Sequence, residues 1–307
     1  MNATISHAMT VQVWTMLICL SVLWGGSFFF VGVAVNSFPA LTIVTLRVGI
    51  AAIVLWGIVG IFGLRPPKGL KIWVAFLVMG LLNNVIPFGL IVWGQTQITS
   101  GVASILNAAT PIFTVMIAGI LLPDEKPTPM KLIGVMIGFV GVAVMIGIPA
   151  LIGENSLLAQ LAIIGATISY ACAGVYGRRF KAFDIKPLTT AAGQVTASTI
   201  LLLPLTLFVD GIVDVTLISM STWSAVIGLA VMSTAIAYVL YFKILELAGA
   251  TNVLLVTLLV PVSAILLGFL FLNESLDAIH LLGMGLIAIG LCVIDGRLWN
   301  QFKARLA

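Results

Sequence analysis

Two stretches decide the fold: Asn107-Ala-Ala-Thr-Pro111 and, 150 positions later, Thr257-Leu-Leu-Val-Pro261. Each opens a long apolar run that ends at an acidic turn, at Glu125 in the first case and at Glu274 in the second. The register holds within one residue into the glycines that follow, pairing Gly134 with Gly283 and Gly141 with Gly290. Similarity at a nearly constant spacing indicates an internal repeat. The sequence therefore predicts two related halves, residues 1–150 and 151–307.

The composition is typical of a chain that lies in a membrane. Of the 307 residues, 61% are hydrophobic and 8% charged, with a mean hydropathy of +1.24, whereas soluble domains carry roughly 25% charged residues. The gaps between the apolar runs are too short for a soluble domain that could offer nucleic acid a basic face. We therefore expect a lipid bilayer, and no nucleic acid, as a partner.

Ten apolar segments approach the roughly 20 residues that a transmembrane helix needs. Proline, glycine and charged residues bound them at about 12–34, 40–63, 70–93, 99–122, 131–150, 157–177, 187–209, 223–243, 251–272 and 279–296. The first is too long for a signal peptide and lacks a basic start, so we expect it to be retained. The predicted fold is an all-α integral membrane protein of ten transmembrane helices, present as a monomer.

The loop charges predict an orientation. Alternate loops and the C-terminal tail collect 13 of the 14 basic residues, and the opposite loops carry only acidic ones. Because lysine and arginine concentrate in cytoplasmic loops, both termini are expected in the cytoplasm. The basic residues are Arg65, Lys68, Lys71, Lys126, Lys131, Arg178, Arg179, Lys181, Lys186, Lys243, Arg297, Lys303 and Arg305; the opposing acids are Glu154, Asp210, Asp214, Glu274 and Asp277.

An odd number of spans in each half inverts the second half relative to the first. Inverted repeats are a transporter architecture in which the substrate site lies near mid-membrane between the halves, and the halves exchange conformations to give alternating access. The chain has no phosphate-binding Gly-rich loop, no His-Glu-x-x-His stretch and no metal-ligand cluster, so we expect neither an enzyme nor a cofactor or metal. An intramembrane enzyme and a channel remain the alternatives, and a channel would give flux linear in concentration.

Polar and aromatic residues inside the predicted spans are the candidates for binding a small-molecule substrate, because buried polar groups in membranes face the bundle interior or a water-filled cavity. Pro111 and Pro261 should break their helices and free backbone carbonyls for a cationic group, although a kink that only eases packing is the alternative. The candidates are Trp24, Ser27, Phe28, Asn83, Asn84, Asn107, Thr110, Pro111, Tyr170, Ser233, Thr234, Tyr238, Thr257 and Pro261.

Arg47 is the single charge deep in a predicted span. It either contacts an anionic substrate group or has a structural role, and its counterpart in the second half is Gln194. All ten acidic residues fall in loops or at span ends, so we expect no carboxylate relay for protons, and a facilitator or exchanger instead of a proton antiporter. A phosphorylated cargo would call for more buried basic groups and a cationic cargo for a buried acid. A neutral or zwitterionic cargo remains by elimination, with other metabolites or drugs as the alternative.

The ordered set of motifs resembles the EamA family of the drug/metabolite transporter superfamily. It comprises Leu23-Trp24-Gly25-Gly26-Ser27-Phe28, Leu46-Arg47, the two proline stretches and the two acidic turns. Within the family the chain is similar to YddG-type exporters of aromatic and other neutral amino acids. The resemblance implies amino-acid export across a bacterial inner membrane. It also implies a central cavity lined by spans 1, 3, 4, 6, 8 and 9, with spans 5 and 10 at the periphery and Arg47 in a structural role.

Overall fold

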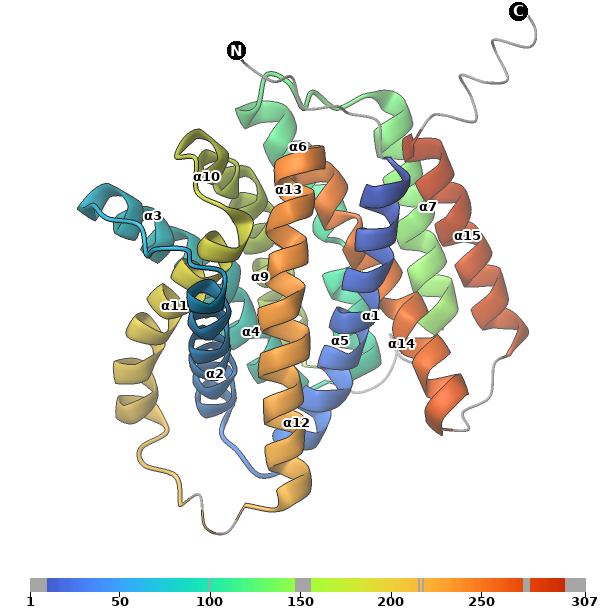
Figure 1. Cartoon of the computed structure of the whole chain (residues 1–307). Helices are drawn as coiled ribbons and strands as arrows, with labels where there is room; N and C mark the ends of the chain where they lie inside the picture. Colours follow the sequence, from blue (N-terminus) through green and yellow to red (C-terminus); the bar gives the residue numbers. More distant parts are fainter. Residues whose placement is uncertain are drawn as a thin grey trace, which may run out of the picture.

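The computed structural model describes residues 10–98, 100–146, 156–214, 216, 218–272 and 277–295. Figure 1 shows a bundle of helices packed side by side. Every regular element among the described residues is helical, because a chain in lipid must satisfy its own backbone hydrogen bonds and a helix does so within one segment. The predictions that concern Glu154, Glu274, Arg297, Lys303 and Arg305 fall outside these residues.

The first half contains both continuous and interrupted helices. Its elements are α1 (Val11–Ala34), α2 (Ala40–Ile61), α3 (Leu70–Gly80), the π-helix η1 (Leu81–Val85), α4 (Ile86–Gln95), α5 (Ser100–Asn107), α6 (Thr110–Leu121) and α7 (Pro129–Ile146). The Thr10 hydroxyl caps the start of α1 by accepting a hydrogen bond from the Val13 N–H, and such a cap satisfies a backbone donor that the helix itself leaves unpaired.

The second half follows the same order. Its elements are α9 (Leu157–Gly177), the short α10 (Arg179–Ala182), α11 (Pro187–Val209), α12 (Met220–Ala230), the π-helix η3 (Val231–Ile236), α13 (Ala237–Leu254), α14 (Val256–Leu272) and α15 (Ala278–Asp295). Gly249 has non-helical torsion angles, φ 86° and ψ 177°, and therefore divides α13 into two helices.

The helices agree with a membrane location. Seven described helical segments are long and apolar enough to cross a membrane, and Pro129–Val144, Val256–Leu267 and Ala278–Ile294 are shorter apolar helices. Large apolar side chains such as Ile120 and Phe208 are exposed on the outside, which suits contact with lipid. The count of ten crossings and the inverted relation of the halves stay predictions.

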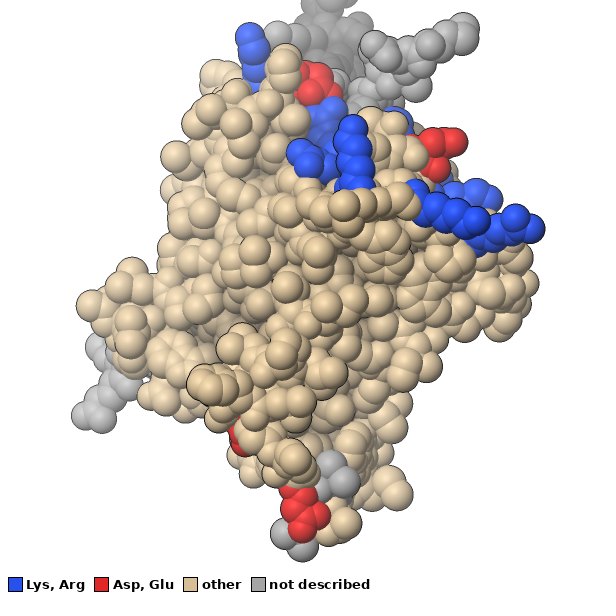
Figure 2. Space-filling model, turned by 90° about the vertical axis from the view of Figure 1, so that its left-hand side faces the viewer, with Lys and Arg blue, Asp and Glu red and all other residues tan. Residues whose placement is uncertain are grey.

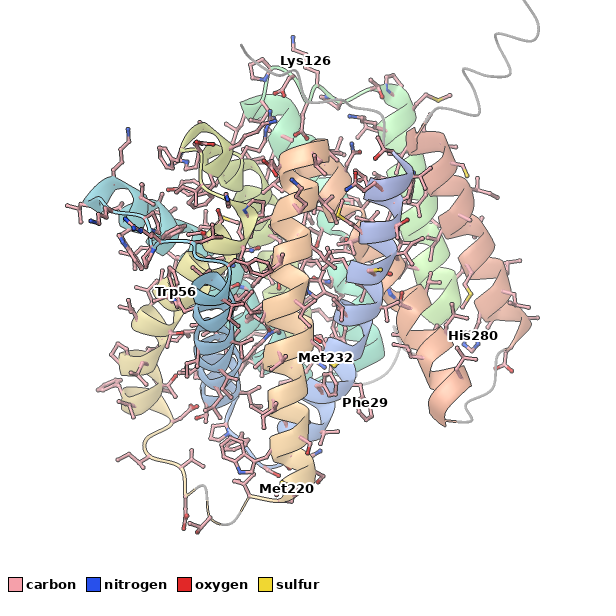
Figure 3. The ribbon with its side chains drawn as sticks, in the orientation of Figure 1. Phe29, Trp56, Lys126, Met220, Met232 and His280 are labelled. Carbon is pink, nitrogen blue, oxygen red and sulfur yellow. The ribbon has the colours of Figure 1, made fainter. Side chains whose placement is uncertain are left out.

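Two helix pairs hold the bundle together through close contacts. α7 and α15 lie side by side at one edge (Figure 1), where a Cβ atom added to Gly134 would come within 2.6 Å of the Gly290 carbonyl oxygen. Glycine is therefore needed for this backbone contact. α2 and α11 pack through polar groups: the Trp56 indole N–H, on the residue labelled in Figure 3, donates to the Thr196 hydroxyl at 2.8 Å.

Basic side chains gather at one end of the long axis of the molecule. Figure 2 shows lysine and arginine side chains gathered at the upper end, whereas the lower end of this face shows acidic side chains alone. Lys126 marks the upper end in Figure 3, and Met220 marks the lower end. The distribution agrees with the predicted alternation of loop charges, and the side of the membrane on which each end lies stays a prediction.

Candidate substrate cavity

Two π-helical turns interrupt the helices of the third and eighth predicted spans. η1 begins at Leu81 and η3 at Val231, 150 positions apart, which is also the spacing between the two proline stretches. Such turns occur frequently at functional sites. Each turn carries two buried polar residues, Asn83 and Asn84 in η1 and Ser233 and Thr234 in η3. The π-turns therefore occupy equivalent places in the two halves.

A network of neutral side chains surrounds η1. The Gln194 amide of α11 donates to the Asn84 side-chain oxygen at 3.0 Å and accepts from the Asn83 amide at 3.3 Å. Asn84 in turn donates to the Ser198 hydroxyl at 2.7 Å, and the Tyr238 hydroxyl donates to the Asn84 oxygen. Buried polar networks of this kind are stable when their members have partners, and this one joins α11 and α13 to η1.

Arg47 makes the corresponding contacts around η3. Its Nε–H donates to the Thr234 hydroxyl at 2.7 Å, and its Nη2 donates to the Ser233 carbonyl oxygen at 3.2 Å. The central carbon of the guanidinium lies 3.7 Å from the centre of the Phe88 ring, a cation–π contact. Arg47 therefore joins α2 to η3 and α4.

The two networks correspond in part. Phe88 and Tyr238 are 150 positions apart, so each half supplies an aromatic ring at the same place. Arg47 and Gln194, which the sequence comparison pairs, each bond to the second polar residue of the other half's π-turn. These two contacts are thus equivalent in the two halves, while the charge is present in one of them.

A small cavity lies beside Arg47. Its volume is about 50 Å³, and its wall is mainly apolar and aromatic. Six of the fourteen residues predicted to bind substrate line it: Trp24, Ser27, Phe28, Asn107, Tyr170 and Thr257. Pockets with an apolar wall and a few convergent polar groups are typical of small-molecule sites. This cavity is the candidate substrate site.

The remaining predicted residues lie around the cavity. Asn83, Asn84, Ser233, Thr234 and Tyr238 belong to the two networks. Thr110, Pro111 and Pro261 are buried at or near the interruptions of their helices. The structure therefore brings the predicted residues into one region, with fewer than half of them in the cavity wall.

The two prolines differ in their helices. Pro111 follows the interruption between α5 and α6, as predicted, whereas Pro261 lies inside the continuous helix α14, so the prediction that it breaks its helix is wrong. α5 ends at Asn107 and α6 begins at Thr110, and Leu255 separates α13 from α14. At each interruption a threonine hydroxyl accompanies the break: Thr110 donates to the Asn107 carbonyl oxygen at 2.6 Å, and Thr257 donates to the Leu254 carbonyl oxygen at 2.8 Å. These hydroxyls stabilise carbonyl groups at the interruptions.

Eight wall residues were not among the predicted set. They are Val31, Arg47, Phe88, Ile91, Val92, Gln95, Leu254 and Val260. The repeat could have identified Phe88, since it occupies the position in the first half that corresponds to Tyr238. The wall also differs from the one that the family resemblance implied. The second predicted span contributes Arg47 through α2, and the eighth predicted span, 223–243, contributes no described wall residue.

Glu125 ties the turn after α6 to the helix that starts beyond Gly249. Its carboxylate accepts hydrogen bonds from the Ala250 N–H at 2.9 Å, the Thr251 N–H at 2.9 Å and the Thr251 hydroxyl at 2.6 Å. Arg178 adds an ion pair to Glu125 at 3.2 Å. A carboxylate at a helix N-terminus is favourable because it meets unpaired N–H groups and the positive end of the helix dipole.

Glu125 lies in a turn, as predicted, but its burial was not predicted. Its side chain is 4% exposed, because the start of the helix beyond Gly249 packs over its carboxylate. The neighbouring residues of the turn, Asp124 and Lys126, are exposed. Glu125 is not part of the cavity wall.

Comparison with known proteins assigns the family. The model of the EamA-like transporter family matches residues 12–147 and again residues 157–295. A solved crystal structure superposes with a TM-score of 0.75 at 17% sequence identity, covering 94% of this chain and 98% of that one. At this identity the likeness concerns the fold alone.

Relatives of the chain include two proteins named as transporters and one, PecM, whose name states no function. The uncharacterized transporter YoaV of Bacillus subtilis is 25% identical over 92% of this chain and 96% of its own length. The uncharacterized inner membrane transporter YedA of Escherichia coli is 26% identical over 91% and 89%. Protein PecM of Dickeya dadantii is 24% identical over 78% and 79%. With nearly all of its length matched by the family model, the chain belongs to the EamA-like transporter family.

Proposed function

We propose that the protein is an alternating-access carrier for a small neutral or zwitterionic metabolite, with neutral and aromatic amino acids as the first candidates. The observation that carries the proposal is the cavity beside Arg47, because residues of both halves form its wall. A site at the junction of two repeats, beside interrupted helices, is where transporters of this architecture bind their cargo.

The size of the cavity supports movement of its walls during transport. At about 50 Å³ it is well below the roughly 300 Å³ from which ligand pockets usually begin. Cargo therefore has to widen the cavity when it enters. The bonds of Glu125 close the lysine- and arginine-rich end of the bundle between α6 and α13, and opening toward that end would require their release.

The chemistry of the wall supports the class of cargo. Trp24, Phe28 and Tyr170 present aromatic surface, while Asn107 and Ser27 offer polar groups. The described wall includes no carboxylate and no histidine, the groups that proton-coupled transporters commonly use. We therefore propose facilitated diffusion or exchange in place of a carboxylate relay for protons.

We further propose that residues 1–150 and 151–307 are inverted repeats of five spans each. The equal spacing of the π-turns and of the proline stretches supports this relation. The loop charges support cytoplasmic termini, and the relation to YedA supports an inner membrane location. We also propose that the carrier is a monomer and that it exports its cargo. The direction of transport rests on the resemblance to amino-acid exporters.

Transport by purified protein in liposomes tests the proposal. Uptake of labelled threonine, methionine and phenylalanine should saturate with concentration and accelerate when the vesicles contain unlabelled cargo. An imposed pH gradient should leave the initial rate nearly unchanged. Flux linear in concentration would indicate a channel. Strong acceleration by the pH gradient would contradict the proposal that transport is not coupled to protons. Failure to transport any member of a broad amino-acid panel would exclude amino acids as the cargo.

A further inference from the structure

Arg47 forms no ion pair with any residue that the structure describes. The side chain is 5% exposed, and the described ion pairs join Arg178 to Asp124 and Glu125, and Lys243 to Glu246. An unpaired charge buried in a membrane protein is unfavourable by several kcal/mol, and such residues commonly mark substrate pathways. The Thr234 hydroxyl, the Ser233 carbonyl and the Phe88 ring compensate the charge in part.

The structural link that Arg47 makes does not require a charge. In the other half, Gln194 joins its helix to the equivalent π-turn through the Asn84 side chain, and glutamine is neutral. A helix is thus linked to a π-turn by a charged side chain in one case and by a neutral side chain in the other. The cation stands in the network that faces the cavity, and Gln194 does not line the cavity.

The guanidinium also retains a nitrogen without a hydrogen bond to the described residues. Nε and Nη2 hydrogen-bond to Thr234 and Ser233, whereas Nη1 has no hydrogen-bond partner among the described residues, and Arg47 is part of the cavity wall. Asn107 belongs to the same wall and has a buried side-chain oxygen without a partner among those residues. The wall therefore offers a cation with a free donor and, separately, a free acceptor.

We infer that Arg47 binds an anionic group of the cargo, and that the carrier therefore requires cargo bearing a carboxylate. This inference rests on the proposed function and narrows it. A carboxylate matches the planar guanidinium and a single positive charge, and its ammonium partner in a zwitterion finds an acceptor in the Asn107 oxygen. A phosphate would bring a larger charge than one arginine compensates.

Ligand-induced changes in thermal stability of the purified full-length protein test the inference without relying on transport. The probes are phenylalanine, 3-phenylpropionate, which lacks the ammonium, phenylalaninamide, which lacks the carboxylate, and inorganic phosphate. The wild-type protein should be stabilised by the first two and not by the others. Binding of phenylalaninamide as tight as that of phenylalanine would overturn the carboxylate requirement.

Variants of Arg47 distinguish the effect of its charge from the effect of its hydrogen bonds between helices. Arg47→Gln copies the residue that makes the equivalent link in the other half, so the fold should persist while carboxylate affinity falls at least about tenfold. Arg47→Lys should retain part of the affinity. Gln194→Met is the matched control, because it removes the equivalent hydrogen bonds outside the cavity and should leave the preference for acid over amide intact.

The outcomes also distinguish this inference from the proposed cargo. If 3-phenylpropionate binds in an Arg47-dependent manner while no amino acid binds or moves, the amino-acid cargo fails and the anion site stands. If amino acids move but Arg47→Gln retains the preference for acid over amide, the anion site fails and the carrier stands. Should Arg47→Gln not fold, the acid–amide comparison on the wild type and on Arg47→Lys decides.

Discussion

Glu125 holds Thr251 by both of that residue's donors, the backbone N–H at 2.9 Å and the hydroxyl at 2.6 Å. The two residues are 126 positions apart in sequence, one in the turn after α6 and the other at the start of the helix beyond Gly249. The contact joins the first half of the chain to the second. Lys126, the residue after Glu125, marks the upper end of the bundle in Figure 3, and Figure 2 shows the lysines and arginines gathered at that end.

Replacing Glu125 by glutamine should weaken this junction. The neutral amide keeps one acceptor oxygen for the three donors of Ala250 and Thr251 and loses the ion pair with Arg178. Hydrogen bonds to a charged group contribute about 1.5–3 kcal/mol, so the melting temperature of the detergent-solubilised protein should fall clearly. Asp124→Asn is the control, because Asp124 is 42% exposed and exposed ion pairs contribute about 0–1 kcal/mol. Equal losses in the two variants would contradict the role given to the cap.

Gly249 should not tolerate a side chain. Its φ of 86° is unfavourable for other residues, and an added Cβ would lie 2.7 Å from the Glu125 carboxylate. We expect Gly249→Ala to destabilise the protein by more than the roughly 1 kcal/mol due to φ alone. Gly211→Ala has a similar φ of 73° with no atom within 4 Å of the added Cβ, so the difference between the two melting temperatures measures the clash. A difference near zero would argue against it.

The hydroxyl of Tyr238 should contribute to stability and that of the nearby Tyr241 should not. Both rings are buried, but Tyr238 donates to Asn84, while the Tyr241 hydroxyl has no partner among the described residues. Removing one buried hydrogen bond costs about 1 kcal/mol, and more where the partner is left unpaired. Thermal unfolding should therefore show a loss for Tyr238→Phe and little change or a gain for Tyr241→Phe. The reverse order would contradict the network around η1.

Asn107 should affect cargo binding more than Ser104, which precedes it by one turn of α5. Both side chains carry a buried oxygen without a partner among the described residues, yet Asn107 alone of the two lines the cavity. Asn107→Ala should raise the half-saturation concentration for phenylalanine about tenfold, the effect of losing one hydrogen bond to a charged group. Ser104→Ala should leave it near the wild-type value. Saturation curves in liposomes measure both, and equal values for the two variants would exclude a contact from Asn107.

Local sequence patterns were enough to predict the helices and the repeat. Apolar runs punctuated by proline, glycine and charge are local signals, and lipid permits few structures other than helices to such runs. The predicted spans therefore coincide with described helices to within a few residues at most ends; α12 starts three residues before its span. The spacing of 150 related Pro111 to Pro261. The two π-turns begin at the same spacing, although no residue pattern in the sequence had predicted π-turns.

Tertiary structure alone decided which face of each helix points inward. A membrane helix that is apolar all round has no polar face to reveal its rotation, so the sequence could not tell whether Arg47 reached a cavity or only a neighbouring helix; it does both. Burial of Glu125 required the start of a helix 125 positions away to fold over it. Contacts between distant segments, which depend on packing and not on local pattern, set the charge and the shape of the site.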